Sequence, residues 1–142
     1  QELVDKVGVV MAEVKPDVVI TFGPRGVSDH DDHITIHKAT TQAFDAYRTS
    51  AASAPRLFYV AIPQDVARQY KMELDGPEVE PTVFIDITDY KEYKIRALRM
   101  YSSQKDAQEL AEMFEQASWA VETFHQAYPP VEDGQVAHGF WG

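Results

Sequence analysis

Hydrophobic positions along the first third of the chain follow two spacings, which predict helices and strands in turn. Residues 2–15 carry apolar side chains at every third or fourth position, which predicts an amphipathic helix. Residues 18–22 form a short, continuous apolar run, as expected of a strand buried on both faces. The helical spacing then returns over residues 32–47. An order of helix, strand and helix is typical of layered α/β proteins.

The rest of the chain continues this alternation with two more strands and two more helices. The pattern predicts strands at residues 57–62 and 82–87, and helices at residues 89–101 and 105–128. Residues 63–81, which are rich in charge and proline, are predicted to cross the surface.

The predicted fold class is therefore α/β, with helices layered on a mainly parallel sheet. Three strands are few for such a sheet, which normally has about five or six, and the first helix has no strand before it. We expect this chain to lack the N-terminal strands of its fold. Residues 1–128 would form the C-terminal portion of one α/β domain, and residues 129–142, which begin with a Pro-Pro pair, a C-terminal tail.

Composition narrows the classes of partner and cofactor. The net charge of -10 argues against nucleic acid and against an anionic membrane surface, since both favour a basic face. No apolar run approaches the roughly 18 residues of a membrane span. The chain has no cysteine, which predicts a cytoplasmic protein and excludes thiolate metal ligands. Any metal would be held by His, Asp and Glu, a set that suits zinc or another divalent transition metal.

A cluster of histidines and aspartates follows the first predicted strand. His30 and His33 lie three residues apart and are flanked by Asp29, Asp31 and Asp32. Imidazole and carboxylate groups near the C-terminal end of a strand are typical of hydrolytic metal sites, and Asp32 is placed to orient an imidazole. A surface helix with acidic capping residues and incidental histidines would give the same pattern. The residues alone leave these two interpretations balanced.

Two more residues near this cluster have both a functional and a structural interpretation. Arg25 precedes the histidines and is a candidate to contact a substrate hydroxyl or phosphate, or else a solvated loop arginine. His37 follows His33 by one helical turn, a spacing that allows chelation if both rings face the same way.

Three segments also occur in an order found in a known family. The first has Pro-Asp-Val-Val-Ile-Thr at residues 16–21, Gly-Pro at residues 23–24 and His-Asp-Asp-His at residues 30–33. It closely resembles the second conserved block, P-D-V-V-x-T and G-H-P-D-H, of the LmbE-like, or N-acetylglucosaminyl-phosphatidylinositol de-N-acetylase, family. Residues 86–104 resemble the family's later strand, helix and terminal Ser-Gln, and residues 122–124 resemble its E-x-F. The matches cover most of the chain.

The resemblance implies a zinc-dependent hydrolase on a Rossmann-like α/β fold. Such enzymes remove acetyl or related acyl groups from the nitrogen of amino sugars, such as N-acetylglucosamine, and of their conjugates. By that resemblance His33 is the metal ligand, and His30 is the histidine that stabilises the oxyanion or assists proton transfer. Asp32 is the aspartate that supports the two histidines.

The chain departs from the family pattern in one decisive way. The family's first block, an A-H-P-D-D loop that supplies a histidine ligand, an aspartate ligand and the aspartate base, has no counterpart in this sequence. A catalytic zinc site usually takes three protein ligands, and His33 is one. We therefore expect this chain to be inactive alone, with the remaining groups supplied by a missing N-terminal segment or a second chain.

Two other functions share features with this sequence. The first is a catalytically inactive domain of the same fold, kept for sugar binding or oligomerisation; a homo-oligomer is compatible with either reading. The second is a metallo-β-lactamase-like hydrolase, whose motif H-x-H-x-D-H also ends in His-x-Asp-His. Ser28 stands where that motif needs a histidine, which argues against it.

Overall fold

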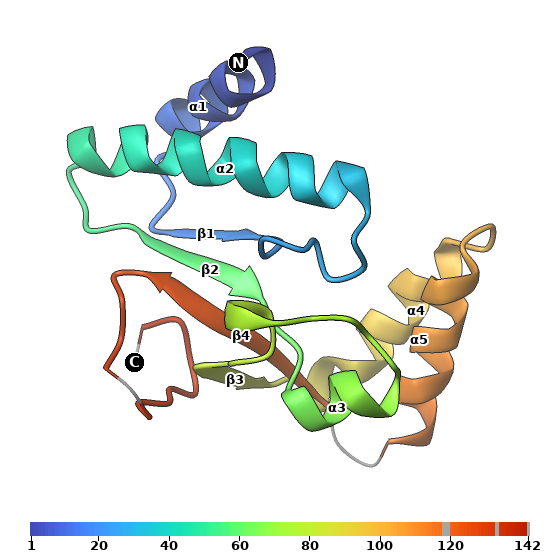
Figure 1. Cartoon of the computed structure of the whole chain (residues 1–142). Helices are drawn as coiled ribbons and strands as arrows, with labels where there is room; N and C mark the ends of the chain where they lie inside the picture. The colour runs from blue at the N-terminus through green and yellow to red at the C-terminus, as the bar shows by residue number, and fades with distance from the viewer. Residues whose placement is uncertain (118–119, 133, 142) are drawn as a thin grey trace. The chain divides into compact units, whose positions relative to one another are not determined.

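The computed structural model describes residues 1–117, 120–132 and 134–141. Contacts divide the chain into two compact units, one of residues 1–83 with 123–142 and one of residues 84–122. The elements, drawn in Figure 1, are α1 (Glu2–Val14), β1 (Val18–Thr21), α2 (Asp31–Ser50), β2 (Arg56–Val60), α3 (Gln64–Gln69), η1 (Gly76–Glu78), β3 (Val83–Asp86), η2 (Thr88–Tyr90), α4 (Lys91–Met100), α5 (Lys105–Gln116) and β4 (Val121–Tyr128).

The four strands form one mixed sheet in the order β1-β2-β4-β3. β1 pairs with β2 in parallel, with Val19 opposite Leu57. β4 pairs with β2 antiparallel, with Phe58 opposite Gln126. The predicted α/β class is confirmed. The prediction of a mainly parallel sheet is not, because β4 runs against β2.

The predicted helix over residues 105–128 is wrong in its second half. α5 ends at Gln116 and β4 follows; residues 118–119 lie outside the described part of the chain. Thr123 and Phe124 are of the β-branched and aromatic types that favour strands, and pairing with β2 leaves Phe124 buried. Helical spacing of apolar residues continued through this segment, so only the long-range pairing distinguished the two structures.

In the first unit, α1 and α2 lie over one face of the β1–β2 pair (Figure 1). Successive strand residues point to opposite faces. Leu57 accordingly packs with Met11, Ala43 and Phe44 against the helices. Phe58 faces the other way, with its ring 4.8 Å from that of Phe140 in the C-terminal tail.

The start of β1 is set by the end of α1. Lys15 takes a left-handed conformation (φ 53°) and donates its N–H to the carbonyl of Met11, and Pro16 prevents the helix from continuing. β1 is the first strand in the sheet order. Ile20 is 45% exposed, so the expectation of a strand buried on both faces is wrong at this position.

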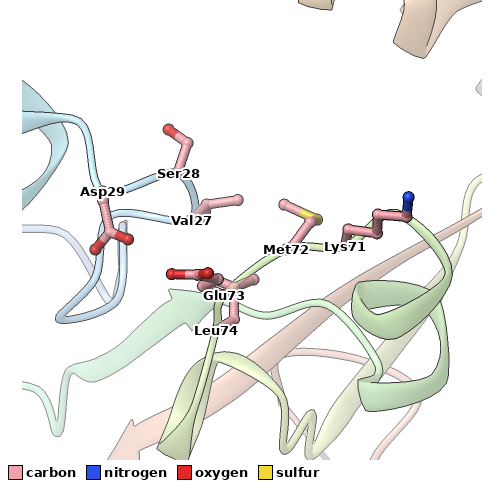
Figure 2. Close-up of a pocket in the computed structure, with 7 residues that line it drawn as sticks. All are labelled: Val27, Ser28, Asp29, Lys71, Met72, Glu73 and Leu74. Carbon is pink, nitrogen blue, oxygen red and sulfur yellow. The ribbon is translucent and has the colours of Figure 1, made fainter.

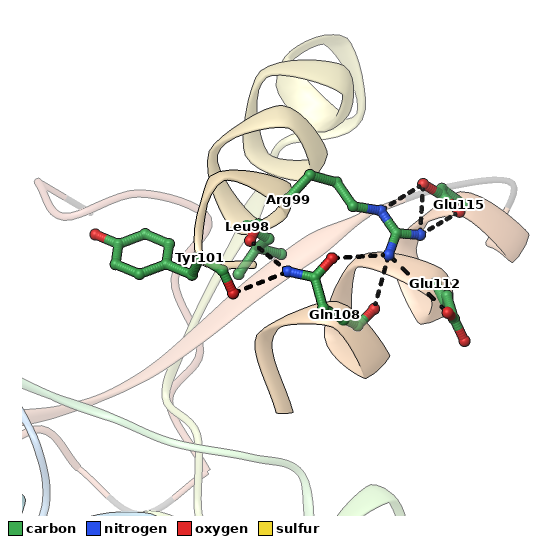
Figure 3. Close-up of polar contacts among 6 residues, drawn as sticks. All are labelled: Leu98, Arg99, Tyr101, Gln108, Glu112 and Glu115. Atoms are coloured by element: carbon green, nitrogen blue, oxygen red, sulfur yellow. Dashed lines mark hydrogen bonds and ion pairs between the residues drawn. The ribbon is translucent and has the colours of Figure 1, made fainter. Parts of the chain in front are cut away.

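The second unit, residues 84–122, contains α4 and α5. Arg99 of α4 makes a bidentate contact with Glu115 of α5, at 2.9 and 3.0 Å from Nη2, and Nη1 donates to the side-chain oxygen of Gln108 at 3.1 Å (Figure 3). The amide of Gln108 donates to the carbonyls of Leu98 and Tyr101. Each of these carbonyls also accepts a backbone N–H, from Tyr101 and Gln104 respectively, so the Gln108 amide adds a second donor at the end of α4. The apolar contact is made by Ile95, Phe114 and Ala120, with Ile87, Leu98 and Met113 around them.

No helix among the described residues combines the length and the apolar character needed to cross a bilayer.

Candidate functional site

The loop between β1 and α2 brings the two predicted histidines together at the start of α2. Their ring centroids are 5.1 Å apart. His30 is the N-cap of α2, where its Nδ1 accepts the backbone N–H of Asp32 at 3.2 Å. Asp31 and Asp32 occupy the first turn, where the helix dipole favours negative charge. The helix therefore begins at this point for reasons visible in the sequence, and His33 follows in its first turn.

His33 is held by a backbone contact that fixes which ring nitrogen is free. Its Nδ1 lies 2.9 Å from the carbonyl oxygen of Gly26, and its ring stacks on Phe22 with centroids 3.9 Å apart. A carbonyl only accepts hydrogen bonds, so Nδ1 carries the proton and Nε2 of the neutral ring has a free lone pair. Metal-bound histidines commonly donate their other ring N–H to a carbonyl or carboxylate in this way.

His30 has the opposite arrangement. Its Nδ1 is the acceptor of the capping hydrogen bond, so in the neutral ring the proton lies on Nε2. Its side chain is exposed. The two neighbouring rings therefore present different groups: a lone pair at Nε2 of His33 and an N–H donor at Nε2 of His30.

Asp32 contacts His30 through its backbone N–H and not through its carboxylate. Its side chain is 91% exposed, and its carboxylate lies 3.9 Å from Nδ1 of His30, beyond hydrogen-bond distance. The contact with His30 comes from the N–H of Asp32. A direct orienting bond from this carboxylate to either ring is therefore not present in the structure.

Arg25 is engaged within the loop. Its Nε and Nη2 lie 2.8 Å from the two carboxylate oxygens of Asp29, and both side chains are partly exposed. This hydrogen-bonded pair raises the pKa of Arg25 above its ordinary value. The guanidinium is thereby held against Asp29, the residue before His30.

His37 lies one turn further along α2 and faces the end of β1. Its Nδ1 is 2.8 Å from the carbonyl oxygen of Phe22, and its ring meets Tyr59 edge-on with centroids 5.0 Å apart. Among the described residues, no three His, Asp or Glu side chains are grouped closely enough to hold a metal ion. Because the Nδ1 of His37 also faces a carbonyl, its Nε2 has a lone pair as that of His33 does, so each of the two histidines offers a nitrogen ligand without a full set beside it.

A buried glutamate that the sequence analysis missed holds this loop in place. Glu78 is fully buried, and its carboxylate accepts the backbone N–H groups of Arg25 at 2.7 Å and Val27 at 2.9 Å. Its backbone carbonyl accepts the N–H of Ile62, just beyond β2. A Cβ added to Gly23 would lie 2.5 Å from Cδ of Glu78, so the close approach requires glycine there.

The prediction that residues 63–81 only cross the surface is therefore wrong at Glu78. One glutamate among several charged residues carries no periodic signal, and its partners lie 51 and 53 residues away in the sequence. Only the tertiary structure distinguishes it from its exposed neighbours.

A shallow pocket of about 290 Å³ lies beside the loop (Figure 2). Residues 27–29 form one wall and residues 71–74 the other, with Asp29 and Glu73 contributing carboxylates. Val27, Asp29 and Lys71 have φ values of 65°, 54° and 54°. Left-handed conformations are costly for residues other than glycine, above all for a β-branched valine, and they gather at functional sites.

Comparison with known proteins identifies the family. The sequence model of the PIG-L family, GlcNAc-PI de-N-acetylase, matches residues 1–44, which contain β1, the loop and His30, His33 and His37. The 1D-myo-inositol 2-acetamido-2-deoxy-alpha-D-glucopyranoside deacetylase of Saccharomonospora viridis is 30% identical over 116 residues, 72% of this chain and 43% of that relative. The chain belongs to the PIG-L family. The LmbE-like resemblance seen in the sequence is thereby confirmed.

Other PIG-L relatives carry the same name. The protein of Kineococcus radiotolerans is 27% identical over 131 residues, which cover 73% of this chain and 36% of the relative. The protein of Rhodococcus erythropolis is 30% identical over 126 residues, which cover 72% of this chain and 43% of the relative. This chain spans less than half the length of each of these relatives.

Proposed function

We propose that this chain supplies part of the active site of a zinc-dependent hydrolase that removes an N-acetyl or related N-acyl group from an amino sugar or its conjugate. The observation that carries the proposal is the pair of Nδ1 contacts, to a backbone carbonyl at His33 and to a backbone N–H at His30, which imply opposite tautomers of the two neutral rings. Both histidines lie within the segment that the PIG-L model matches. The relatives' names specify a 2-acetamido sugar joined to inositol, which supports a conjugate of this chemical class as substrate.

The proposed metal ligand is Nε2 of His33. Its lone pair and its Nδ1–H···O=C contact with Gly26 suit a nitrogen ligand for zinc, although another divalent transition metal would also accept imidazole. A bound zinc ion would polarise the acyl carbonyl and lower the pKa of a coordinated water. Catalytic zinc usually has three protein ligands, so we propose that the others come from polypeptide outside these 142 residues.

The surface next to β1 supports that completion of the site. β1 has a second edge with no neighbouring strand among the described residues. Ile20 on this strand and Val10 and Val14 on α1 are 45%, 57% and 66% exposed, and an apolar groove of about 280 Å³ runs between the two elements. A further segment or a second chain that pairs with β1 would bury these side chains while bringing its own ligands to the end of the strand. A homo-oligomer would use the same surface.

His30 is the proposed catalytic acid. Its Nε2–H would donate to the oxygen that gains charge during attack on the amide, or pass a proton to the departing amine; the capping bond at Nδ1, which leaves the proton on Nε2, supports this role. We propose that Asp32, exposed beside it, supports the imidazole once substrate is bound. Arg25 would contact a hydroxyl or phosphate of the substrate, whose hydroxyl-rich part would occupy the pocket beside Asp29 and Glu73.

The alternative is an inactive domain that binds sugar or mediates oligomerisation. The lack of a group of three ligands among the described residues favours it over an enzyme complete in this chain. It shares the fold and the surface of the proposed hydrolase, so only an activity measurement separates the two.

Removal of the metal provides that measurement. In the complete assembly, this chain with the polypeptide that completes the ligands, we expect a chelator to stop acetate release from 1D-myo-inositol 2-acetamido-2-deoxy-alpha-D-glucopyranoside, because zinc activates the water. Zinc, but not magnesium, should restore it, since magnesium prefers oxygen ligands. Binding of the sugar without acetate release at any zinc concentration would support the inactive domain instead.

A further inference from the structure

The peptide group between Gly26 and Val27 is bonded on both sides. Its N–H, on Val27, donates to Oε1 of Glu78 at 2.9 Å, and its carbonyl, on Gly26, accepts from Nδ1 of His33 at 2.9 Å. The N–H and C=O of a trans peptide point in opposite directions. The carboxylate, the peptide and the imidazole therefore form one continuous chain of hydrogen bonds.

We propose that Glu78 is a positioning residue that sets the tautomer and orientation of His33 through this peptide. The inference rests on the proposed function, because it takes Nε2 of His33 as the atom that binds the metal. Consecutive hydrogen bonds polarise one another. An anionic group at one end makes the Gly26 carbonyl a stronger acceptor, which keeps the proton on Nδ1 and the lone pair on Nε2. A metal-binding histidine becomes more basic when a carboxylate contacts it directly. Here the peptide group lies between the carboxylate of Glu78 and the imidazole of His33.

Glu78 also maintains the conformation that aims this carbonyl. Gly26 and Val27 both have left-handed backbones, with φ of 64° and 65°. The second oxygen of Glu78 accepts the N–H of Arg25, so the carboxylate holds the backbone on both sides of Gly26. Without it, the strained Val27 would be free to relax, and the Gly26 carbonyl would turn away from His33.

The anchor for this arrangement is the sheet. The backbone carbonyl of Glu78 accepts the N–H of Ile62, two residues after the end of β2, at 2.7 Å, and Glu78 itself ends η1. Glu78 thus links the loop that holds the His33 ring to the segment after β2, through its carboxylate on one side and its backbone carbonyl on the other. A buried carboxylate without hydrogen-bond partners would destabilise the fold. The contacts of Glu78 with the loop offset that cost.

The test is Glu78→Gln in this chain, read by long-range ¹H–¹⁵N NMR of the imidazoles at pH about 8, above the ordinary range of histidine. Glutamine keeps the size, but its NH₂ group cannot accept one of the two backbone N–H groups. We expect the Nδ1–H to Nε2–H ratio of His33 to fall about fivefold, the worth of one ordinary hydrogen bond. In the complete assembly, zinc affinity should fall by up to about fivefold, because no more than this one hydrogen bond is lost.

Three comparisons make the result specific. Glu80→Gln removes an exposed carboxylate two residues away and should leave His33 unchanged. Glu78→Asp keeps the charge and should retain more of the Nδ1–H form than Glu78→Gln. His125, whose Nδ1 donates to the carbonyl of Glu80 at 2.8 Å, reports whether the change stays local. If Glu78→Gln does not fold, Glu78→Asp, whose shorter side chain draws the carboxylate away from the loop, takes the same measurement against the wild type, with a smaller fall in the ratio expected.

A folded Glu78→Gln chain in which His33 keeps the wild-type ratio would overturn the inference, as would an equal change at His125. The proposed function fails separately. If the ratio at His33 falls as expected but the complete assembly neither binds zinc nor releases acetate, Glu78 positions the histidine and the deacetylase assignment is wrong.

Discussion

Replacing His33 with alanine should abolish deacetylation by the complete assembly and remove most of its zinc. The ring supplies the prepared lone pair at Nε2, and its Nδ1 contact with Gly26 shows that the other nitrogen is already occupied. A metal acting as a Lewis acid contributes several kcal/mol to the transition state, and each ~1.4 kcal/mol is tenfold in rate. We therefore expect kcat/KM to fall on the order of a thousandfold or more, with zinc content measured by mass spectrometry falling in parallel.

The matched control is His138→Ala. His138 is an exposed histidine of the C-terminal tail, so its loss removes an imidazole without touching the loop. Both turnover and zinc content should match the wild type. Full zinc content in His33→Ala would show that the ligands lie elsewhere, whatever happens to the rate.

Replacing His30 with asparagine should slow the reaction without releasing the metal. His30 offers an N–H at Nε2, and general acid or base groups contribute about 10²- to 10⁴-fold. Asparagine is a favoured N-cap, so it can still accept the N–H of Asp32 and preserve the start of α2. We expect kcat to fall within that range while zinc content and thermal stability stay near those of the wild type.

Comparison with His30→Ala separates the two roles of this residue. Alanine removes the cap as well, at a further cost of about 1 kcal/mol in stability, but it should lose no more rate than asparagine does. If His30→Asn keeps wild-type kcat while His30→Ala loses it, His30 is a cap alone and its proposed catalytic role is wrong.

The first half of the fold was predictable because its signals are local. α1 ends where Lys15 and Pro16 stop it, and α2 begins at a capping residue followed by two aspartates. β4 was not predictable in the same way. Its apolar residues fit a helical spacing, and its strand form depends on pairing with β2, more than 60 residues earlier, as in the 62-residue separation of the Thr123 hydroxyl and the Ala61 carbonyl.

In the candidate site, too, the local features were predictable and the long-range ones were not. His30 and His33 are close in sequence and share the start of one helix, so their juxtaposition follows from the spacing. The tautomers do not, because they depend on where the Gly26 carbonyl points. That direction depends in turn on Glu78, whose contacts span 51 and 53 residues. Sequence motifs therefore located the chemical groups, while the contacts that prepare them required the tertiary structure.

The central claim is that Nε2 of His33 is one ligand of a zinc site that other polypeptide completes. Titration of this chain alone with zinc, followed by long-range ¹H–¹⁵N NMR of the imidazoles, tests it most directly. We predict weak binding that does not saturate at micromolar zinc, with the main shift at Nε2 of His33. Tight binding of one zinc per chain would contradict the shared site, and shifts that leave His33 unchanged would contradict its role as ligand.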